Sequence, residues 1–157
     1  MFNYKLKEFF RDFYQLLLVL LQFFIIFLHF IEWEFISREE IIQSNVIFNL
    51  ISVFMIIGGL IIMLMAVKDL GSNFSPFPKP KPNSNLTTRG VYSLIRHPMY
   101  YSLIMLSFGI FINKLSIYYL VLTLSLIAII KFKILLEEEY LNNKFSNYCV
   151  YKDKVKY

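Results

Sequence analysis

Long apolar runs constrain the fold of this chain more than any other feature of its sequence. Leu, Phe and Ile continue almost unbroken from Phe13 to Ile31, and a second apolar run extends from Val46 to Val67. Each run is long enough to cross a bilayer as an α-helix, which takes about 20 residues. Hydrophobic residues make up 57% of the 157 residues, more than a soluble fold of this size could bury. The sequence therefore predicts an all-α integral membrane protein.

Two shorter apolar runs, Met99–Ile112 and Leu115–Ile130, are separated only by Asn113 and Lys114. At 1.5 Å per residue the first covers roughly 21 Å, less than the roughly 30 Å hydrocarbon core. We therefore predict a tight helical hairpin whose first helix begins at or before Pro98, since proline suits a first helical turn. The charged and aromatic tail, Lys131–Tyr157, is expected to begin as a continuation of the last helix. This gives a bundle of about four transmembrane helices with a cytoplasmic helical tail.

The segments between these runs are polar. Glu32–Asn45 is expected to be a loop, and in Lys68–Asn83 proline stands at positions 76, 78, 80 and 82. Alternating prolines exclude a helix and favour an extended segment. All but two of the 16 Lys and Arg residues, Arg38 and Lys114, fall on one side of the four-helix arrangement. Basic residues favour the cytoplasmic side, so we predict a multi-pass protein with both termini in the cytoplasm.

Several function classes are disfavoured by the same pattern. The net charge of +5 comes from basic residues that flank apolar runs, so it does not indicate nucleic-acid binding. The lone Cys149 excludes an intramolecular disulfide and is interpreted as a small buried or interfacial residue. Gln15, Gln22 and His29 recur every seven residues and would share one helix stripe. Hydrogen bonding between helices is the favoured interpretation of this stripe, and a substrate-lining role for His29 remains open.

Two groups of polar and aromatic residues are expected to meet on the cytoplasmic face. One contains Tyr92, Arg96, His97 and Tyr100, and the other is the Glu137–Glu139 triplet where the last helix leaves the membrane. A hairpin returns its second helix to the side from which the first started, so the Arg-His corner should lie near Glu137 and Glu138. Such a site suits a zwitterionic ligand with an aromatic base, although the glutamates could also be a solvated face paired with nearby lysines.

The motifs resemble those of the isoprenylcysteine carboxyl methyltransferase family, part of a larger set of membrane methyltransferases that includes phospholipid N-methylating enzymes. The resemblance rests on Gly90-x-Tyr92, then Arg96-His97-Pro98-x-Tyr100, a membrane hairpin, and Glu137-Glu138-x-x-Leu141 followed by aromatic residues. It covers roughly residues 71–156. It implies a single domain, 1–157, with two transmembrane helices in 1–70 and a cofactor-binding loop, hairpin and tail in 71–157.

The resemblance also implies a cofactor and its contacts. The cofactor would be S-adenosylmethionine, held without a glycine-rich dinucleotide loop. Its predicted contacts are Ser84, Asn85, Leu86, Thr87, Tyr92, Arg96, His97, Pro98, Met99 and Glu138. Lys133, where the family has an arginine, would bind a substrate carboxylate. Arg96 and Glu138 would align the reactants, no residue is assigned as an acid or base, and no metal is expected.

The predicted function is methyl transfer to a lipidic or prenylated acceptor, with a carboxylate favoured as the accepting group. The partners expected are this amphiphilic substrate and membrane lipid, with no nucleic acid and no obligate protein partner. Three alternatives remain open at this point: an N-methyltransferase acting on a phospholipid or another amine, a sterol-reductase-like enzyme using NADPH, and a non-catalytic membrane protein whose basic face binds anionic lipid.

Overall fold

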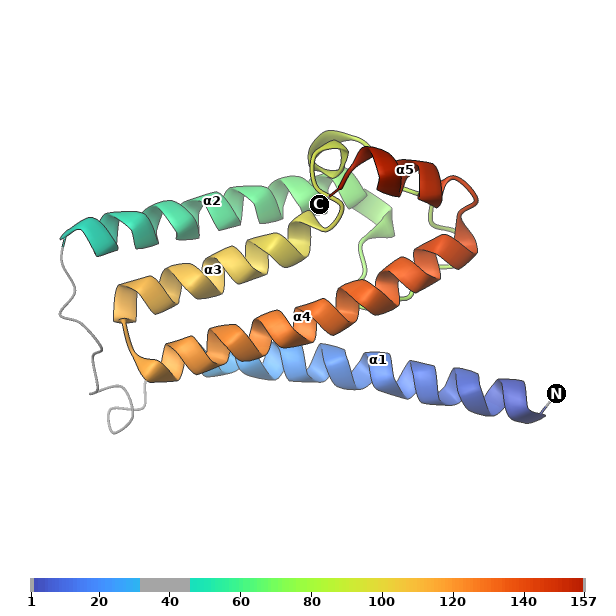
Figure 1. Cartoon of the computed structure of the whole chain (residues 1–157), viewed down its shortest axis with the longest axis horizontal. Helices are drawn as coiled ribbons and strands as arrows, with labels where there is room; N and C mark the ends of the chain where they lie inside the picture. The colour runs from blue at the N-terminus through green and yellow to red at the C-terminus, as the bar shows by residue number, and fades with distance from the viewer. Residues whose placement is uncertain (1, 32–45, 157) are drawn as a thin grey trace.

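The computed structural model describes residues 2–31 and 46–156, and the regular structure of these residues is helical (Figure 1). The predicted loop Glu32–Asn45 lies outside them. The elements, in chain order, are α1 (Phe2–Leu28), α2 (Val46–Leu70), the 3₁₀ turns η1 (Gly71–Asn73) and η2 (Gly90–Ser93), α3 (Pro98–Lys114), α4 (Ile117–Lys144) and α5 (Tyr148–Lys154). The predicted all-α membrane bundle is confirmed.

Three of these helices, α1, α2 and α4, are long and apolar enough to cross a membrane. The fourth, α3, has 17 residues and would span about 25 Å. It is the short first arm of the predicted hairpin, and Pro98 occupies its first turn as expected. The second arm, α4, continues without a break into the charged region and ends at Lys144.

The predicted boundaries need two corrections. Helix α2 continues past Val67 to Leu70, so the extended segment starts later than the sequence suggested. The hairpin turn lies at Leu115–Ser116 instead of Asn113–Lys114. Leu115 takes the left-handed conformation with φ 43°, and the Ser116 hydroxyl accepts a hydrogen bond from the Tyr118 amide at 3.3 Å. Serine is a preferred residue for capping the start of a helix, which explains why α4 begins after it.

The helices pack as two pairs that are joined through α3 and α4. Helix α2 lies along α3, and α1 lies along α4 (Figure 1). A Cβ at Gly109 would lie 2.8 Å from the Ile56 side chain, so this glycine allows α2 and α3 to approach closely. Helices α3 and α4 converge at the hairpin turn and separate toward the end where α5 lies (Figure 1). Side chains and the chain segment between α2 and α3 occupy this widening space.

The polar stripe of α1 faces the interior of the bundle. Gln15, Gln22 and His29 are all buried. One ring nitrogen of His29 lies 2.8 Å from the Ile25 carbonyl oxygen, and the other lies 2.7 Å from the Ser107 hydroxyl on α3. Ser107 in turn lies 2.8 Å from the Thr123 hydroxyl on α4. These hydrogen bonds join three helices, in agreement with the interpretation of the stripe as helix–helix contacts.

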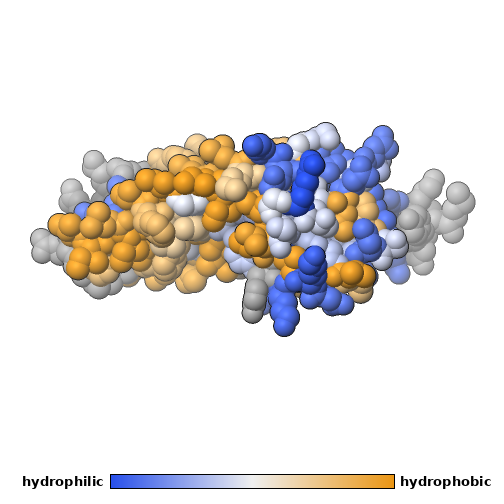
Figure 2. Space-filling view, turned by 90° about the horizontal axis from the view of Figure 1, so that it is seen from above, coloured by the Kyte–Doolittle hydropathy of each residue, from blue (hydrophilic) through white to orange (hydrophobic). Residues whose placement is uncertain are grey.

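The surface divides along the long axis of the molecule. Seen from above, hydrophobic residues gather over the part formed by α2, and hydrophilic residues gather toward the end that carries α5 (Figure 2). Side chains such as Phe54 and Leu64 of α2 are 74% and 70% exposed, as expected of a helix that faces lipid. The polar end is where the predicted site residues lie.

Candidate active site at the polar end of the bundle

The Gly-x-Tyr motif forms a turn that is held by the end of α2. Gly90 has φ +60°, a conformation that glycine adopts without strain. The Asp69 carboxylate accepts a hydrogen bond from the Val91 amide at 2.8 Å, and a Cβ at Gly90 would collide with this carboxylate. Glycine is therefore required both by the backbone angle and by the close approach of Asp69. The turn buries Tyr92 against the end of α2.

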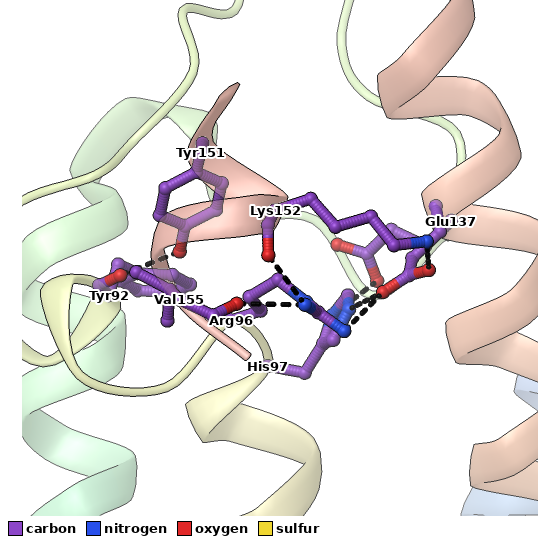
Figure 3. A network of polar contacts seen from close by, with 8 residues as sticks. Tyr92, Arg96, His97, Glu137, Tyr151, Lys152 and Val155 are labelled. Atoms are coloured by element: carbon purple, nitrogen blue, oxygen red, sulfur yellow. Dashed lines mark hydrogen bonds and ion pairs between the residues drawn. The ribbon is translucent and has the colours of Figure 1, made fainter. Parts of the chain in front are cut away.

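Arg96, His97 and Glu138 meet as the hairpin geometry predicts. An Arg96 Nη lies 3.1 Å from a Glu138 carboxylate oxygen, and His97 Nε2 lies 3.4 Å from the same oxygen (Figure 3). Lys152 of α5 reaches the other Glu138 oxygen at 2.6 Å. The side chains of Arg96 and Glu138 are each only 15% exposed, so these charged hydrogen bonds are partly shielded from water.

Helix α5 is fastened over this corner by hydrogen bonds to the chain around Tyr92 and Arg96. The Tyr151 hydroxyl donates to the Tyr92 carbonyl oxygen at 2.6 Å (Figure 3). Arg96 Nη1 donates to the carbonyl oxygens of Val155 at 2.8 Å and Lys152 at 3.2 Å. Burial raises the pKa of Tyr151 to about 12, so its hydroxyl keeps the proton it donates at physiological pH.

The segment between η1 and η2, residues 74–89, is called the strap below. The side-chain amide of Asn73 donates to the Asn85 carbonyl oxygen at 3.0 Å and to the Thr87 hydroxyl at 3.2 Å. Lys144, at the end of α4, donates to the Ser84 hydroxyl at 2.8 Å. The strap therefore lies between the end of α2 and the end of α4. It contains no helix, as its prolines predict, but it is not extended throughout, because a turn is closed by a hydrogen bond from the Ser84 amide to the Lys81 carbonyl oxygen at 3.1 Å.

Two hollows adjoin at this end of the bundle. The strap cavity has a volume of about 90 Å³ and lies between the strap, α4 and α5. Its walls are formed by Leu70, Asn73, Ser75, Phe77, Pro78, Pro80, Ser84, Asn85, Leu86, Thr87, Tyr92, Arg96, Glu137, Leu141, Phe145, Tyr148 and Tyr151. Polar groups from the strap thus face aromatic side chains from the tail across this cavity.

The bundle cavity has a volume of about 240 Å³ and lies among the four long helices. Its walls are formed by Gln22, Phe23, Ile26, Met63, Leu70, Phe74, Ser75, Pro76, Tyr92, Arg96, His97, Met99, Tyr100, Leu103, Lys133 and Glu137. The two cavities share Leu70, Ser75, Tyr92, Arg96 and Glu137, so these residues form the wall between them. A ligand in one cavity would lie next to a ligand in the other.

Lys133 is a buried cation in the wall of the bundle cavity, with only 1% of its surface exposed. Its ammonium donates to the Gln22 side-chain oxygen at 2.6 Å and to the Pro76 carbonyl oxygen at 3.0 Å. It also lies 5.2 Å from the centre of the Tyr100 ring. No carboxylate pairs directly with this ammonium among the described residues, so the cation is available to an anionic ligand.

The structure separates the predicted cofactor contacts into three groups. The strap cavity is lined by Ser84, Asn85, Leu86, Thr87, Tyr92 and Arg96, and the last two also line the bundle cavity. His97 and Met99 line the bundle cavity only. Pro98 is fully buried, and Glu138 holds Arg96, His97 and Lys152 together; neither residue is in the walls of the strap cavity or the bundle cavity.

Sequence reasoning did not assign site roles to Glu137 and Tyr148, which line these cavities. Glu137 stands in the wall between the two cavities, whereas its neighbour Glu138 faces the Arg96 corner. Successive helical residues point about 100° apart, so the double glutamate supplies one carboxylate to each place. Tyr148 belongs to an aromatic series in the tail that the resemblance noted, but only the fold shows that it reaches the strap.

Two polar atoms at the strap cavity lack an internal partner. The Tyr148 hydroxyl and Arg96 Nε are buried and form no hydrogen bond within the described part of the chain. Buried polar atoms of this kind are unfavourable unless a ligand or water satisfies them. They suit a polar, zwitterionic molecule such as S-adenosylmethionine. No group of His, Cys, Asp and Glu side chains in residues 2–31 and 46–156 is arranged to hold a metal ion.

Comparison with known proteins agrees with this arrangement. A sequence model of the phospholipid methyltransferase family matches residues 47–148, a range that includes α2, the strap, the hairpin and the first residue of α5. No curated protein matches the chain. The match confirms the resemblance at the level of membrane methyltransferases and covers more than half of the sequence. The chain therefore belongs to the phospholipid methyltransferase family.

Proposed function

We propose that this membrane methyltransferase binds S-adenosylmethionine in the strap cavity and methylates an amphiphilic acceptor held in the bundle cavity. The observation that carries the proposal is the shared wall of the two cavities. There Tyr92, Arg96 and Glu137 stand between the strap cavity, lined by polar strap residues and aromatic rings, and the largely apolar bundle cavity. Together the two volumes lie near the lower end of the roughly 300–1,000 Å³ typical of ligand pockets.

The residues of the strap cavity fit the donor. Tyr148 and Arg96 offer unpaired donors to its carboxylate and hydroxyl groups, and Phe145 provides an aromatic face for the adenine. When bound, the donor supplies a methyl group on a positively charged sulfur. The partly buried Glu138 network fixes the Arg96 side chain, and α5 covers one side of the cavity with Tyr148 and Tyr151. Alignment and exclusion of water are the contributions that a methyl displacement requires from the protein.

A carboxylate on a lipidic or prenylated molecule is the acceptor that we favour. Lys133 places a buried ammonium in an otherwise apolar chamber, and this arrangement attracts an anionic head group with an attached hydrocarbon chain. A carboxylate oxygen attacks the methyl carbon without losing a proton, so no general base is needed. The new C–O bond forms as the S–C bond breaks, and the sulfur leaves as a neutral thioether.

An amine, such as the head group of a phospholipid, is the second candidate acceptor. Glu137 lines both cavities and provides a carboxylate that could bind an ammonium group and accept its proton. This reading is equally compatible with the family. Both readings place the chain in the membrane with its polar end in the cytoplasm, as the distribution of basic residues predicts.

The experiment that tests the donor site uses Tyr148→Phe in detergent-solubilised full-length protein. Because the Tyr148 hydroxyl has no internal partner, its removal should leave thermal stability unchanged. We expect the affinity for S-adenosylmethionine, measured by calorimetry, to fall about fivefold, the effect of about 1 kcal/mol for one hydrogen bond. NADPH should not bind either protein. Unchanged donor affinity in the variant, or binding of NADPH alone, would contradict the proposal.

The acceptor is identified with a methyl-labelled donor. Membranes that contain the protein are incubated with a lipid extract, and the labelled product is tested for release by mild base. Methyl esters are hydrolysed by base, whereas methylated amines are not. Base-labile label that is lost in Lys133→Met supports the carboxylate; base-stable label that is lost in Glu137→Gln supports the amine.

A further inference from the structure

Tyr100 lines two separate hollows, and both have walls formed by α3 and α4. It stands in the first turn of α3 and forms part of the bundle cavity. It also lines a separate hollow of about 260 Å³, called here the α3–α4 groove. The other walls of the groove are mostly aliphatic and include Ile104, Ile127, Ile130, Ile134 and Leu135. The Tyr100 side chain is therefore a partition between the chamber for the acceptor and a groove on the outside of the bundle.

The Tyr100 ring is held in this position from three directions. It stacks on the His97 ring with a centroid distance of 5.8 Å and an interplanar angle of 26°. The Lys133 ammonium lies 5.2 Å from its ring centre. Its hydroxyl lies near the Glu137 carboxylate. All three partners line the bundle cavity, so a change in the occupant of that cavity would alter the contacts that keep the partition closed.

The groove has the surroundings of a lipid site. Leu135 is 59% exposed and Tyr101 is 42% exposed, on a part of α3 and α4 that faces outward. Lys131 also lines the groove, is exposed, and has no ion-pair partner among the described residues. An aliphatic groove with a single exposed lysine among its walls complements a hydrocarbon chain that carries an anionic group, and the amphipathic Tyr101 is typical of the membrane–water interface.

We propose that the α3–α4 groove binds an acyl chain of an anionic phospholipid, with Lys131 at its phosphate, and that Tyr100 is a gate that separates this chain from the acceptor cavity. The identification of the bundle cavity as the acceptor cavity rests on the proposed function. The groove, the partition and the lysine do not depend on it. Tyr100 would thereby restrict which hydrocarbon chains reach the reacting groups.

The experiment uses the full chain in phosphatidylcholine vesicles that contain phosphatidylglycerol with a photoactivatable diazirine on its acyl chain. Cross-linked residues are identified by mass spectrometry. We expect labelling of Ile104, Ile127 and Ile134 to exceed that of Phe54, which is 74% exposed on the lipid-facing side of α2. Lys131→Gln should reduce labelling of the groove several-fold, to the level obtained with an equivalent phosphatidylcholine probe.

Two variants of the gate complete the test. In Tyr100→Ala the label should spread several-fold into the bundle cavity, at Leu103 and Met63. In Tyr100→Phe, which retains the ring, Leu103 and Met63 should stay unlabelled. Circular dichroism checks folding, and Tyr100→Leu replaces the alanine variant if the latter is unfolded. The proposal is overturned if the groove is labelled no more than Phe54, or if removal of the ring leaves Leu103 and Met63 unlabelled.

These measurements need no methyl donor, so they remain informative if the proposed reaction is wrong. Failure of S-adenosylmethionine to bind would contradict the proposed function without changing the labelling pattern. Absence of labelling in the groove, together with normal donor binding, would contradict the lipid site alone.

Discussion

Glu138 is predicted to hold the tail of the protein over the strap cavity without entering that cavity. Its carboxylate binds Arg96 at 3.1 Å, His97 at 3.4 Å and Lys152 at 2.6 Å. Replacement of Glu138 by glutamine keeps the size of the side chain but removes its charge and one acceptor oxygen. The remaining carbonyl oxygen is uncharged and can accept from Arg96 or from Lys152, so both charge-assisted contacts are weakened or lost.

The size of this effect follows from burial. A hydrogen bond to a charged group contributes about 1.5–3 kcal/mol, and full burial would raise the cost of breaking the pair. Glu138 is 15% exposed but Lys152 is 46% exposed, so solvent screens part of the interaction. We therefore expect the docking of α5 to weaken by about 2 kcal/mol, which corresponds to a change of about 30-fold in its opening equilibrium.

Hydrogen exchange measures this opening directly. Amides of α5, Tyr148–Lys154, should exchange about 30-fold faster in Glu138→Gln, while those of α2 and α3 keep their protection. The affinity for S-adenosylmethionine should fall as well, because part of its binding energy must then reorder the tail. Glu139→Gln is the matched control, since Glu139 is 57% exposed and its ion pair with Arg11 lies at the surface.

The reasoning is refuted if α5 exchanges at the same rate in the two glutamine variants. Equal rates would mean that the ion pairs at Glu138 do not hold the tail. Faster exchange of α5 with unchanged affinity for S-adenosylmethionine would mean that Glu138 holds α5 in place but that the position of α5 does not affect cofactor binding.

Three further predictions concern the Gly90 turn, the Tyr151 hydroxyl and the membrane topology. Gly90→Ala should lower the free energy of unfolding by at least about 1 kcal/mol, because it introduces strain at φ +60° and a clash with Asp69; thermal unfolding in detergent measures this. The raised pKa of Tyr151, about 12, means that the unfolded chain loses this proton first, near pH 10; stability should fall as the pH rises above 10, and less so in Tyr151→Phe. A reporter fused to either terminus should be detected in the cytoplasm, and an extracellular signal at one terminus would contradict the four-helix topology.

The sequence predicts the helices well because their cause is local. Apolar length alone identifies α1 and α2, whereas α4 reaches its full length by continuing into the charged region; backbone hydrogen bonding in lipid requires all three to be helical. The short first arm of the hairpin was also predictable, from the length of its apolar run. The sequence predicts the hairpin turn two residues too early, because Asn113 and Lys114 are the polar pair that separates the two apolar runs. The capping hydroxyl of Ser116 instead decides where α4 starts.

The candidate site was only partly predictable. The meeting of Arg96 with the glutamates follows from the topology of a hairpin and is confirmed at 3.1 Å. Which glutamate faces the cavities could not be read from two adjacent identical residues, because it depends on the rotation of α4 about its axis. Similarly, Gln22 and Lys133 lie 111 positions apart, and no local pattern indicates that they share a hydrogen bond.

The different lengths of α3 and α4 explain why the site lies where it does. Helix α3 has 17 residues and α4 has 28, so at 1.5 Å per residue α4 extends about 17 Å further from the shared turn. This extension carries Lys133 and Glu137 alongside the start of α3 and then beyond it, toward the strap and α5. The first turn of α3, with His97 and Tyr100, consequently lines the bundle cavity together with Phe74, Ser75 and Pro76 of the strap. Under the proposed function, the short helix after the Arg-His-Pro motif would let the longer α4 and the strap enclose the donor and the acceptor side by side.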